Sequence, residues 1–140
     1  MKAKVKAYSI IPLLFVLLLC VSACATKEKN ATASGTHKSY TQISQDVAKD
    51  MILKDNSLII IDVRTKGEYK EGHIPGAVLI PNESIKDRKP ELLPDVNQVI
   101  LVYCRSGNRS KQAAQKLANM GYNKVYEFGG INTWNGKIVK

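Results

Sequence analysis

Four short apolar runs punctuate the chain after residue 40. They lie at 57–63, 76–80, 98–103 and 124–128. We interpret them as four strands, and the first, which is apolar almost throughout, is typical of a strand buried on both faces of a sheet.

Helical periodicity fills the intervals between these runs. Residues 44–54 and 110–120 place apolar side chains at helical spacing, with Ser44 and Ser110 as candidate caps and Gly121 as the stop of the second helix. The first helix is predicted to present one face made of Val47, Ala48, Met51 and Ile52. Asn82 is the candidate cap of a helical stretch interrupted at Pro90 and Pro94. Strands alternating with helices predict one α/β domain over 40–140, with a mostly parallel central sheet and ligands at the carboxyl ends of its strands.

The third apolar run leads directly into the segment Cys104-Arg105-Ser106-Gly107-Asn108-Arg109-Ser110. A strand ending in cysteine, a short loop and a helix start leave several backbone N–H groups pointing at one spot, where the helix adds positive charge. The thiolate of Cys104 is then stabilised, its pKa falls, and the thiolate is the nucleophile. A cysteine that only packs in a core needs neither Gly107 nor two arginines nearby, so we favour a functional cysteine.

The two arginines of this loop are expected to play different roles. Arg109 directly precedes Ser110, where its guanidinium can bond loop carbonyls or an acidic partner and so organise the loop. Arg105 is expected to be free to meet a substrate anion. The only imidazoles in the chain belong to His37 and His73, so neither a metal site nor a Cys–His pair is expected.

The first 24 residues have the pattern of an export signal. Three lysines within the first six residues precede an apolar run at 10–21, which ends in Val21-Ser22-Ala23-Cys24. This segment resembles a bacterial lipoprotein signal, which implies cleavage before Cys24 and lipid attachment to that cysteine. An ordinary secretory signal and an uncleaved anchor are the alternatives, although a spanning helix needs about 20 apolar residues. Each of the three places the domain outside the cytoplasm.

Residues 24–39 are predicted to be a lipidated cysteine followed by a flexible tether, because the segment is polar and has no apolar period. The chain carries a net charge of +9, but its lysines form no dense run with interleaved aromatics. Nucleic acid is therefore a poor candidate partner, and anionic lipid or small anions are better ones. With Cys24 lipidated, Cys104 is the only free thiol of the mature chain, and an exposed thiol outside the cytoplasm is better explained by chemistry than by stability.

Five segments, in order, resemble a single-domain rhodanese. They are Asp62-Val63-Arg64, Glu68-Tyr69, the segment Gly72-His73-Ile74-Pro75-Gly76-Ala77, the 104–110 loop, and Gly129-Gly130 with Trp134. The resemblance implies a three-layer α/β domain that acts as a sulfurtransferase without a cofactor or a metal. Cys104 takes the sulfane sulfur of thiosulfate or a similar donor, becomes a persulfide and passes the sulfur to cyanide or a thiol.

The resemblance also implies roles for other residues. The loop amides of Arg105, Ser106, Gly107, Asn108, Arg109 and Ser110 would hold the persulfide and the sulfonate of the donor. Asp62 and Arg64 resemble a structural acid and base that brace the loop, and Glu71 is expected to join them. We expect a monomer whose partners are a small anionic sulfur donor, a thiol or cyanide acceptor and, through Cys24, a membrane.

Two competing functions bear on this interpretation. Protein phosphatases and arsenate reductases related to this fold use a longer Cys-x5-Arg loop, whereas Cys104 and Arg109 here form Cys-x4-Arg. The smaller ring suits a sulfur atom better than a tetrahedral oxyanion, which disfavours those enzymes. A membrane-tethered sulfur carrier with negligible turnover of free thiosulfate stays open at this point.

Overall fold

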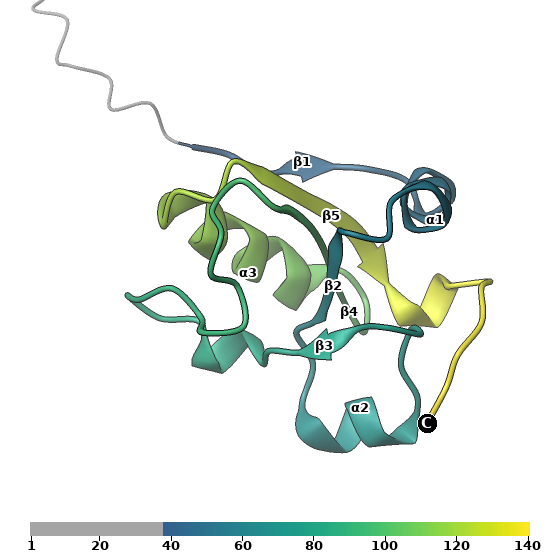
Figure 1. Cartoon of the computed structure of the whole chain (residues 1–140). Coiled ribbons are helices and arrows are strands. Elements are labelled where there is room, and N and C mark those ends of the chain that lie inside the picture. Colours follow the sequence, from purple (N-terminus) through teal and green to yellow (C-terminus); the bar gives the residue numbers. More distant parts are fainter. Residues whose placement is uncertain (1–37) are drawn as a thin grey trace, which may run out of the picture. The chain divides into compact units, whose positions relative to one another are not determined.

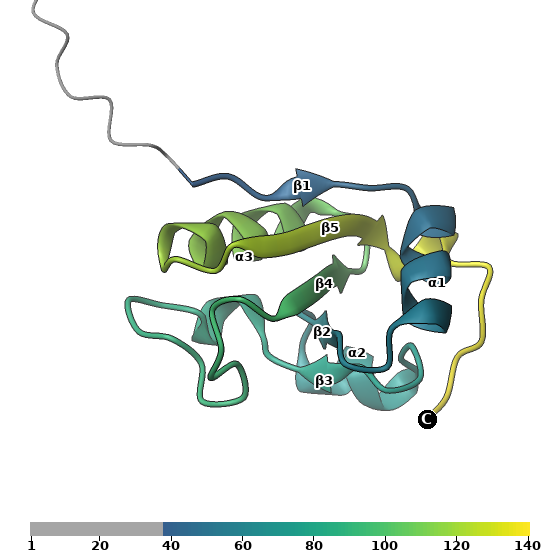
Figure 2. The same ribbon diagram turned by 45° about the horizontal axis from the view of Figure 1, so that its top comes forward.

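A five-stranded, all-parallel sheet forms the centre of the computed structural model, which describes residues 38–140 (Figure 1). The strands are β1 (Thr41–Gln42), β2 (Ile59–Asp62), β3 (Val78–Leu79), β4 (Val99–Cys104) and β5 (Lys124–Gly130). The helices are α1 (Gln45–Lys54), α2 (Lys66–Glu71) and α3 (Asn108–Asn119), with short 3-10 turns η1 (Asn82–Ser84) and η2 (Ile131–Thr133). The strand order is β1-β5-β4-β2-β3, which confirms the predicted α/β class (Figure 2).

Helices cover both faces of the sheet, because alternate side chains of each strand point to opposite sides. One face packs against α3 and the other against α1 (Figure 1). The α3 face contains Ile61, Ile100, Val102, Cys104, Val125 and Leu117. The α1 face contains Ala48, Ile60, Leu101, Tyr103 and Phe128. The domain is therefore built in three layers, as predicted.

The register of the sheet brings the end of β4 between the ends of its neighbours. Asp62 at the end of β2 pairs with Tyr103, and Gly130 at the end of β5 pairs with Cys104. The ladder between β4 and β5 shifts between Val102 and Cys104, which is the irregularity expected of a β-bulge. Bulges re-aim side chains next to functional sites, and this one places Cys104 opposite a glycine.

The structure corrects several predicted elements. Strand β1 and helix α2 were not expected, because a two-residue strand and a six-residue helix leave almost no periodicity to detect. The stretch beginning at Asn82 forms only the short turn η1. Helix α3 begins at Asn108, and its N-cap is Gly107, with φ 100°, so Ser110 lies inside the helix and is not its cap.

The prediction for the first helix is confirmed in part. The Ser44 hydroxyl accepts a hydrogen bond from the backbone N–H of Val47 at 3.2 Å, as expected of a cap. Ala48 is fully buried, and Met51 and Ile52 pack against the α1-face cluster. The Val47 side chain is 47% exposed and does not belong to the buried face.

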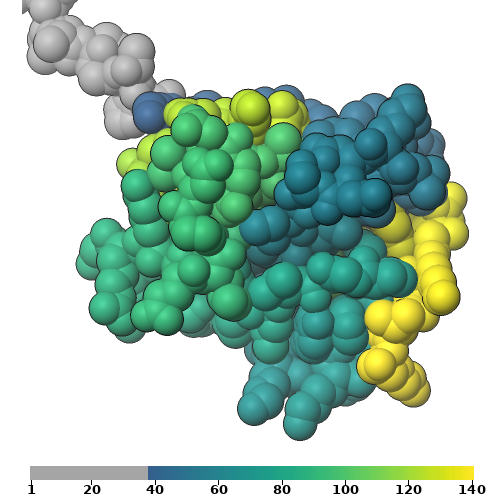
Figure 3. Space-filling view, viewed as in Figure 1, coloured from purple at the N-terminus to yellow at the C-terminus, as the bar shows by residue number. Residues whose placement is uncertain are grey.

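The C-terminal residues lie along the surface beside the segment that follows α2 (Figure 3). Val139 pairs with His73 in an antiparallel bridge, with backbone hydrogen bonds of 2.8 and 2.9 Å. Within residues 38–140, none of the helices has the length and apolar character needed to cross a membrane. Cys24, the tether up to residue 37 and the export signal lie outside the described residues.

Candidate active site

Cys104 lies at the carboxyl end of the central strand β4, and its thiol is free. The backbone N–H of Gly107 donates a hydrogen bond to Sγ at 3.1 Å. The residue is only 1% exposed, which corrects the expectation of an exposed thiol: the loop that follows folds back over the sulfur. A reagent or substrate must therefore enter the loop to reach Sγ.

Opposing effects act on the acidity of this thiol. Burial raises the pKa of Cys104, while hydrogen bonds from the Ser110 hydroxyl and from backbone N–H groups of Ser110, Ser106 and Gly107 lower it. The hydrogen bonds prevail, and the pKa is lowered from its ordinary value. The loop thus favours a buried thiolate, the form that attacks an electrophilic sulfur.

Two glycines allow the loop to turn over the sulfur. Gly107 has φ 100°, a left-handed conformation that side chains rarely adopt. At Gly130, an added Cβ would collide with the Arg105 carbonyl and would lie 2.6 Å from Ser106 Cα. The backbone of β5 therefore touches the loop at Gly130, as expected for the close approach predicted from the Gly129-Gly130 pair.

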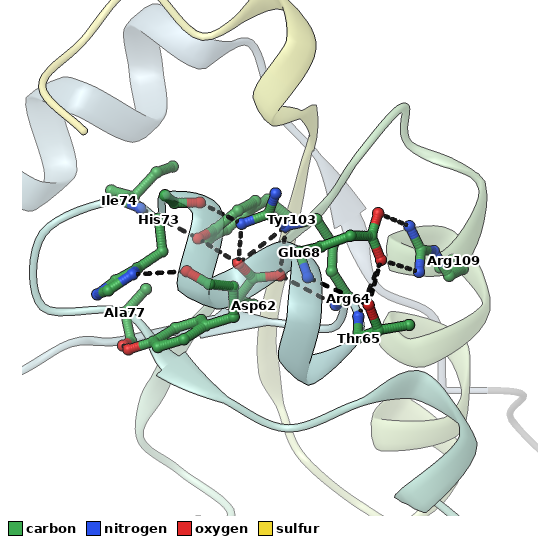
Figure 4. Close-up of polar contacts among 11 residues, drawn as sticks. Asp62, Arg64, Thr65, Glu68, His73, Ile74, Ala77, Tyr103 and Arg109 are labelled. Atoms are coloured by element: carbon green, nitrogen blue, oxygen red, sulfur yellow. Dashed lines mark hydrogen bonds and ion pairs between the residues drawn. The ribbon is translucent and has the colours of Figure 1, made fainter. Parts of the chain in front are cut away.

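Arg109 holds the loop to α2 through a two-pronged ion pair with Glu68 (Figure 4). Its two terminal nitrogens donate to Glu68 Oε2 at 2.8 Å and Oε1 at 2.7 Å. Glu68 also closes a capping box with Thr65 at the start of α2. The Arg109 guanidinium holds the pKa of Glu68 at about 2, well below its usual range. The acidic partner foreseen for Arg109 is thus Glu68.

A second buried pair, Asp62 and Arg64, supports the neighbouring turn rather than the loop itself (Figure 4). Arg64 donates to Asp62 at 2.7 Å and to the carbonyl of Gly72 at 2.7 Å. The Tyr103 hydroxyl donates to Asp62 at 2.7 Å and accepts from the backbone N–H of Ile74 at 3.2 Å. These residues therefore brace segment 72–74 and reach the site only through Tyr103, which precedes Cys104.

The expectation for Glu71 is not met. Glu71 is exposed at the end of α2, and among the described residues no ion pair or hydrogen bond joins its side chain to Asp62, Arg64 or the loop. Glu68, one helical turn earlier, faces Arg109 instead. Glu68 and Glu71 lie only three residues apart, so the sequence alone does not tell which of them meets an arginine. The direction of α2 decides it, by turning Glu68 toward Arg109.

Glu127, a buried carboxylate on β5, was not among the predicted site residues. It is 2% exposed and contacts Ser110, a residue of the 104–110 loop. Its Oε1 accepts from the Ser110 hydroxyl at 2.6 Å and from the backbone N–H of Gly129 at 2.8 Å, and its Oε2 accepts from Gln42 at 3.1 Å. The available signal was a single glutamate within the apolar run 124–128.

The outer side of the loop is open to solvent. Arg105 is exposed, as predicted for a residue free to meet a substrate anion. An open cleft of about 410 Å³ runs between the loop and the β1–α1 connection, and its lining includes Ser106, Gly107, Lys111, Gln45 and Glu127. Within residues 38–140, no group of three or more His, Cys, Asp or Glu side chains is arranged to hold a metal ion.

The site is a free cysteine of lowered pKa, held in a loop of N–H donors at the carboxyl ends of parallel strands. Such a site is suited to cysteine-based chemistry on anions. The chain belongs to the rhodanese-like domain family, whose model matches residues 44–137.

Relatives of known sequence carry sulfur-transfer names. The putative sulfur carrier protein YrkF of Bacillus subtilis (strain 168) is 38% identical over 106 residues, or 75% of this chain and 56% of the relative. The chain thus spans little more than half the length of that protein. Thiosulfate sulfurtransferase PspE of Escherichia coli (strain K12) is 41% identical over 71 residues, or 51% of this chain and 68% of the relative.

Solved structures support the same family. A rhodanese with anions from E. coli is 38% identical, with a TM-score of 0.54, and the match covers 59% of this chain and 96% of that one. A protein from Staphylococcus saprophyticus is 34% identical, with a TM-score of 0.60, and the match covers 71% and 99% of the two chains. Together the comparisons support sulfur transfer in general as the function of this domain.

Proposed function

We propose that the protein is a sulfurtransferase that moves sulfane sulfur from thiosulfate or a persulfide donor to a thiophilic acceptor through a persulfide on Cys104. The observation that carries this proposal is the backbone N–H of Gly107, which donates to Sγ at 3.1 Å within a loop whose hydrogen bonds lower the pKa of Cys104 in spite of its burial. The same donors suit an anionic persulfide, whose outer sulfur extends into the loop.

The reaction balances without a cofactor. The Cys104 thiolate attacks the sulfane sulfur of thiosulfate, the sulfur–sulfur bond of the donor breaks, and sulfite leaves with the bonding electron pair. Cyanide or an acceptor thiolate then attacks the outer sulfur of the persulfide, and Cys104 is released as a thiolate. Each step needs an anion held in a preorganised ring of donors, and exposed Arg105 is suited to pair with the sulfonate of the donor.

Intact mass spectrometry tests the proposal directly. The full chain is incubated with thiosulfate, and we expect a gain of one sulfur atom that maps to Cys104 and disappears on addition of cyanide. Cys104→Ser, which keeps the volume but not the ionisable thiol, should gain no sulfur and show no turnover while retaining the wild-type unfolding temperature. Sulfur gain or turnover in the folded serine variant contradicts the assignment.

A sulfur carrier is the second candidate, and one observation favours it. The relative YrkF bears the name of a putative sulfur carrier. Steady-state thiosulfate:cyanide turnover separates the two functions. A carrier accepts and holds the persulfide but turns over free thiosulfate negligibly, whereas an enzyme does both.

We also propose that the domain is anchored by lipid on Cys24 to a bacterial membrane, outside the cytoplasm. The support is the order Val21-Ser22-Ala23-Cys24 after a basic start and an apolar run. Metabolic labelling with a fatty acid should mark the wild-type protein, and Cys24→Ala should lose the label and leave the membrane fraction. Membrane partition of Cys24→Ala at high salt would instead indicate an uncleaved anchor.

A further inference from the structure

A buried carboxylate ties three segments of the chain together beside the active-site loop. Glu127 Oε1 accepts a hydrogen bond from the Ser110 hydroxyl at 2.6 Å and another from the backbone N–H of Gly129 at 2.8 Å. Its second oxygen, Oε2, accepts a hydrogen bond from Gln42 at 3.1 Å. Glu127 therefore links the first turn of α3, the end of β5 and strand β1.

This carboxylate is buried on a strand whose other residues suit an apolar core. Glu127 is 2% exposed, and its neighbours Val125 and Phe128 belong to the two core clusters. In the described part of the chain it forms no ion pair, and its three hydrogen-bond donors are uncharged. A buried carboxylate loses its hydration and is tolerated only where hydrogen bonds replace that hydration. The place of Glu127 on β5 is thus explained by the groups that its oxygens hold.

Gly107 connects this carboxylate to Cys104. The Gly107 N–H donates to Sγ at 3.1 Å, and the Gly107 carbonyl oxygen lies 2.9 Å from the Ser110 hydroxyl. That hydroxyl has one proton, which is shared between the carbonyl and Glu127. A Cβ added to Gly107 would lie 3.7 Å from Gly129 Cα and 4.0 Å from Glu127 Oε1, so Gly107 rests against both residues. Gly107 is therefore held from behind while its N–H faces the sulfur.

We propose that Glu127 is a positioning residue for Cys104, because it fixes Gly107 in the place from which the Gly107 N–H holds the sulfur. Glu127 touches none of the reacting atoms and exchanges no proton with them. A single carboxylate oxygen suits this task, since it accepts two hydrogen bonds at once and so joins α3 to β5 behind the loop. The inference rests on the sulfur transfer proposed above for its purpose, because thiolate and persulfide both need a preorganised donor.

Two uncharged variants of similar volume separate this role from the effect of charge. Glu127→Gln keeps an oxygen that can accept from Ser110 and Gly129, whereas Glu127→Leu keeps none. Gln42 is exposed and can turn its own amide oxygen toward the new amide nitrogen of Glu127→Gln. Since both variants lack the carboxylate charge, a difference between them reports the loss of the acceptor.

Two measurements on the full chain in detergent report the position of the donor without any sulfur donor. Amide hydrogen exchange at Gly107, read by NMR, should be on the order of 10-fold faster in Glu127→Leu than in Glu127→Gln, which corresponds to about one net hydrogen bond. Alkylation of Cys104 by iodoacetamide, followed by mass spectrometry over a range of pH, should have a higher pH midpoint in Glu127→Leu, because the thiolate loses a donor. The midpoint is the readout, since it does not depend on how easily the reagent enters the loop.

Turnover of thiosulfate and cyanide links the position of the donor to the proposed function. We expect kcat of Glu127→Leu to be on the order of 100-fold below that of Glu127→Gln, the range for a misplaced catalytic donor. KM for thiosulfate should differ little, because Arg105, which is suited to bind the sulfonate, is not a hydrogen-bond partner of Glu127.

Tyr122→Phe is the control for a general loss of stability. It removes a buried hydrogen bond to the carbonyl of Leu93, beyond the opposite end of α3 from the loop. We expect wild-type exchange at Gly107 and a wild-type alkylation midpoint at Cys104 in this variant. Equal acceleration of Gly107 exchange in Tyr122→Phe and Glu127→Leu would overturn the proposal.

Equal Gly107 exchange, or equal alkylation midpoints, in folded Glu127→Gln and Glu127→Leu also overturns the proposal. Should Glu127→Leu fail to fold, Ser110→Ala replaces it, because this change removes the link through the hydroxyl and leaves the link through Gly129. Gly107 exchange must then be faster than in wild type, and an unchanged rate is again decisive against the proposal. A wild-type protein that forms no persulfide contradicts the sulfurtransferase function alone, since exchange and alkylation require no sulfur donor.

Discussion

The ion pair between Glu68 and Arg109 makes the stability of the domain dependent on pH. We expect Glu68→Gln to weaken the fold at neutral pH, because glutamine keeps the shape of the side chain but pairs with no guanidinium charge. The pKa of Glu68 falls from 4.5 to about 2 in the folded protein, chiefly because of the hydrogen bonds from Arg109. A lowered pKa in the folded state means that the pair stabilises the fold above pH ~4.5 and ceases to do so as the pH falls toward ~2.

The magnitude follows from the same values. One pKa unit corresponds to about 1.4 kcal/mol, so the lowering from 4.5 to about 2 sets an upper limit of ~3 kcal/mol. The Arg109 and Glu68 side chains are 26% and 21% exposed, and solvent screening reduces the contribution. We therefore expect Glu68→Gln to lower the free energy of unfolding by ~1–2 kcal/mol at pH 7.

Urea unfolding of wild type and Glu68→Gln, repeated from pH 7 down to pH 2, measures this effect. The difference in unfolding free energy should be largest at neutral pH and should vanish as Glu68 becomes protonated in the folded protein. Glu91→Gln, which changes the same charge at an exposed position, should show little difference at any pH. A loss of stability in Glu68→Gln that stays constant down to pH 2 refutes this reasoning, because it would arise from packing and not from charge.

Three further changes probe the loop and its support. Arg105→Ala should reduce kcat/KM for dianionic thiosulfate more than for a neutral persulfide donor. Arg109→Ala should reduce kcat/KM equally for both donors, because it releases the whole loop from Glu68. Equal losses for both donors in Arg105→Ala would contradict this division of roles. Gly130→Ala should lower kcat/KM by about 100-fold, because the added methyl displaces the loop. Gly67→Ala should not, because an added Cβ there has only Thr65 Oγ1 nearby, at 4.0 Å. Tyr103→Phe should cost about 1–3 kcal/mol in urea unfolding, because two buried partners of its hydroxyl lose their hydrogen bond, and an unchanged stability would contradict this.

Local pattern along the chain was sufficient for much of the fold. The apolar runs located β2, β3, β4 and β5, and helical spacing located α1 and α3, because burial of a strand or of one helix face depends on residues close in sequence. The loop from Cys104 to Ser110 was recognisable for the same reason. Its cysteine, glycine and arginines are neighbours in sequence, and their chemistry does not depend on distant residues.

The partners of that loop were decided only by the tertiary structure. Parallel strands bring Ser110 to Glu127 across 17 residues and Arg109 to Glu68 across 41, and no periodicity records which distant carboxylate meets which donor. The short elements β1 and α2 were also missed, because two strand residues and six helical residues are too few to show a period, although the Thr65 and Glu68 capping box marks the start of α2. Residue types near Cys104 therefore predicted a thiolate stabilised by backbone N–H donors. Its burial, and the carboxylates that hold its loop, emerge only when the sheet brings the ends of β2, β4 and β5 together.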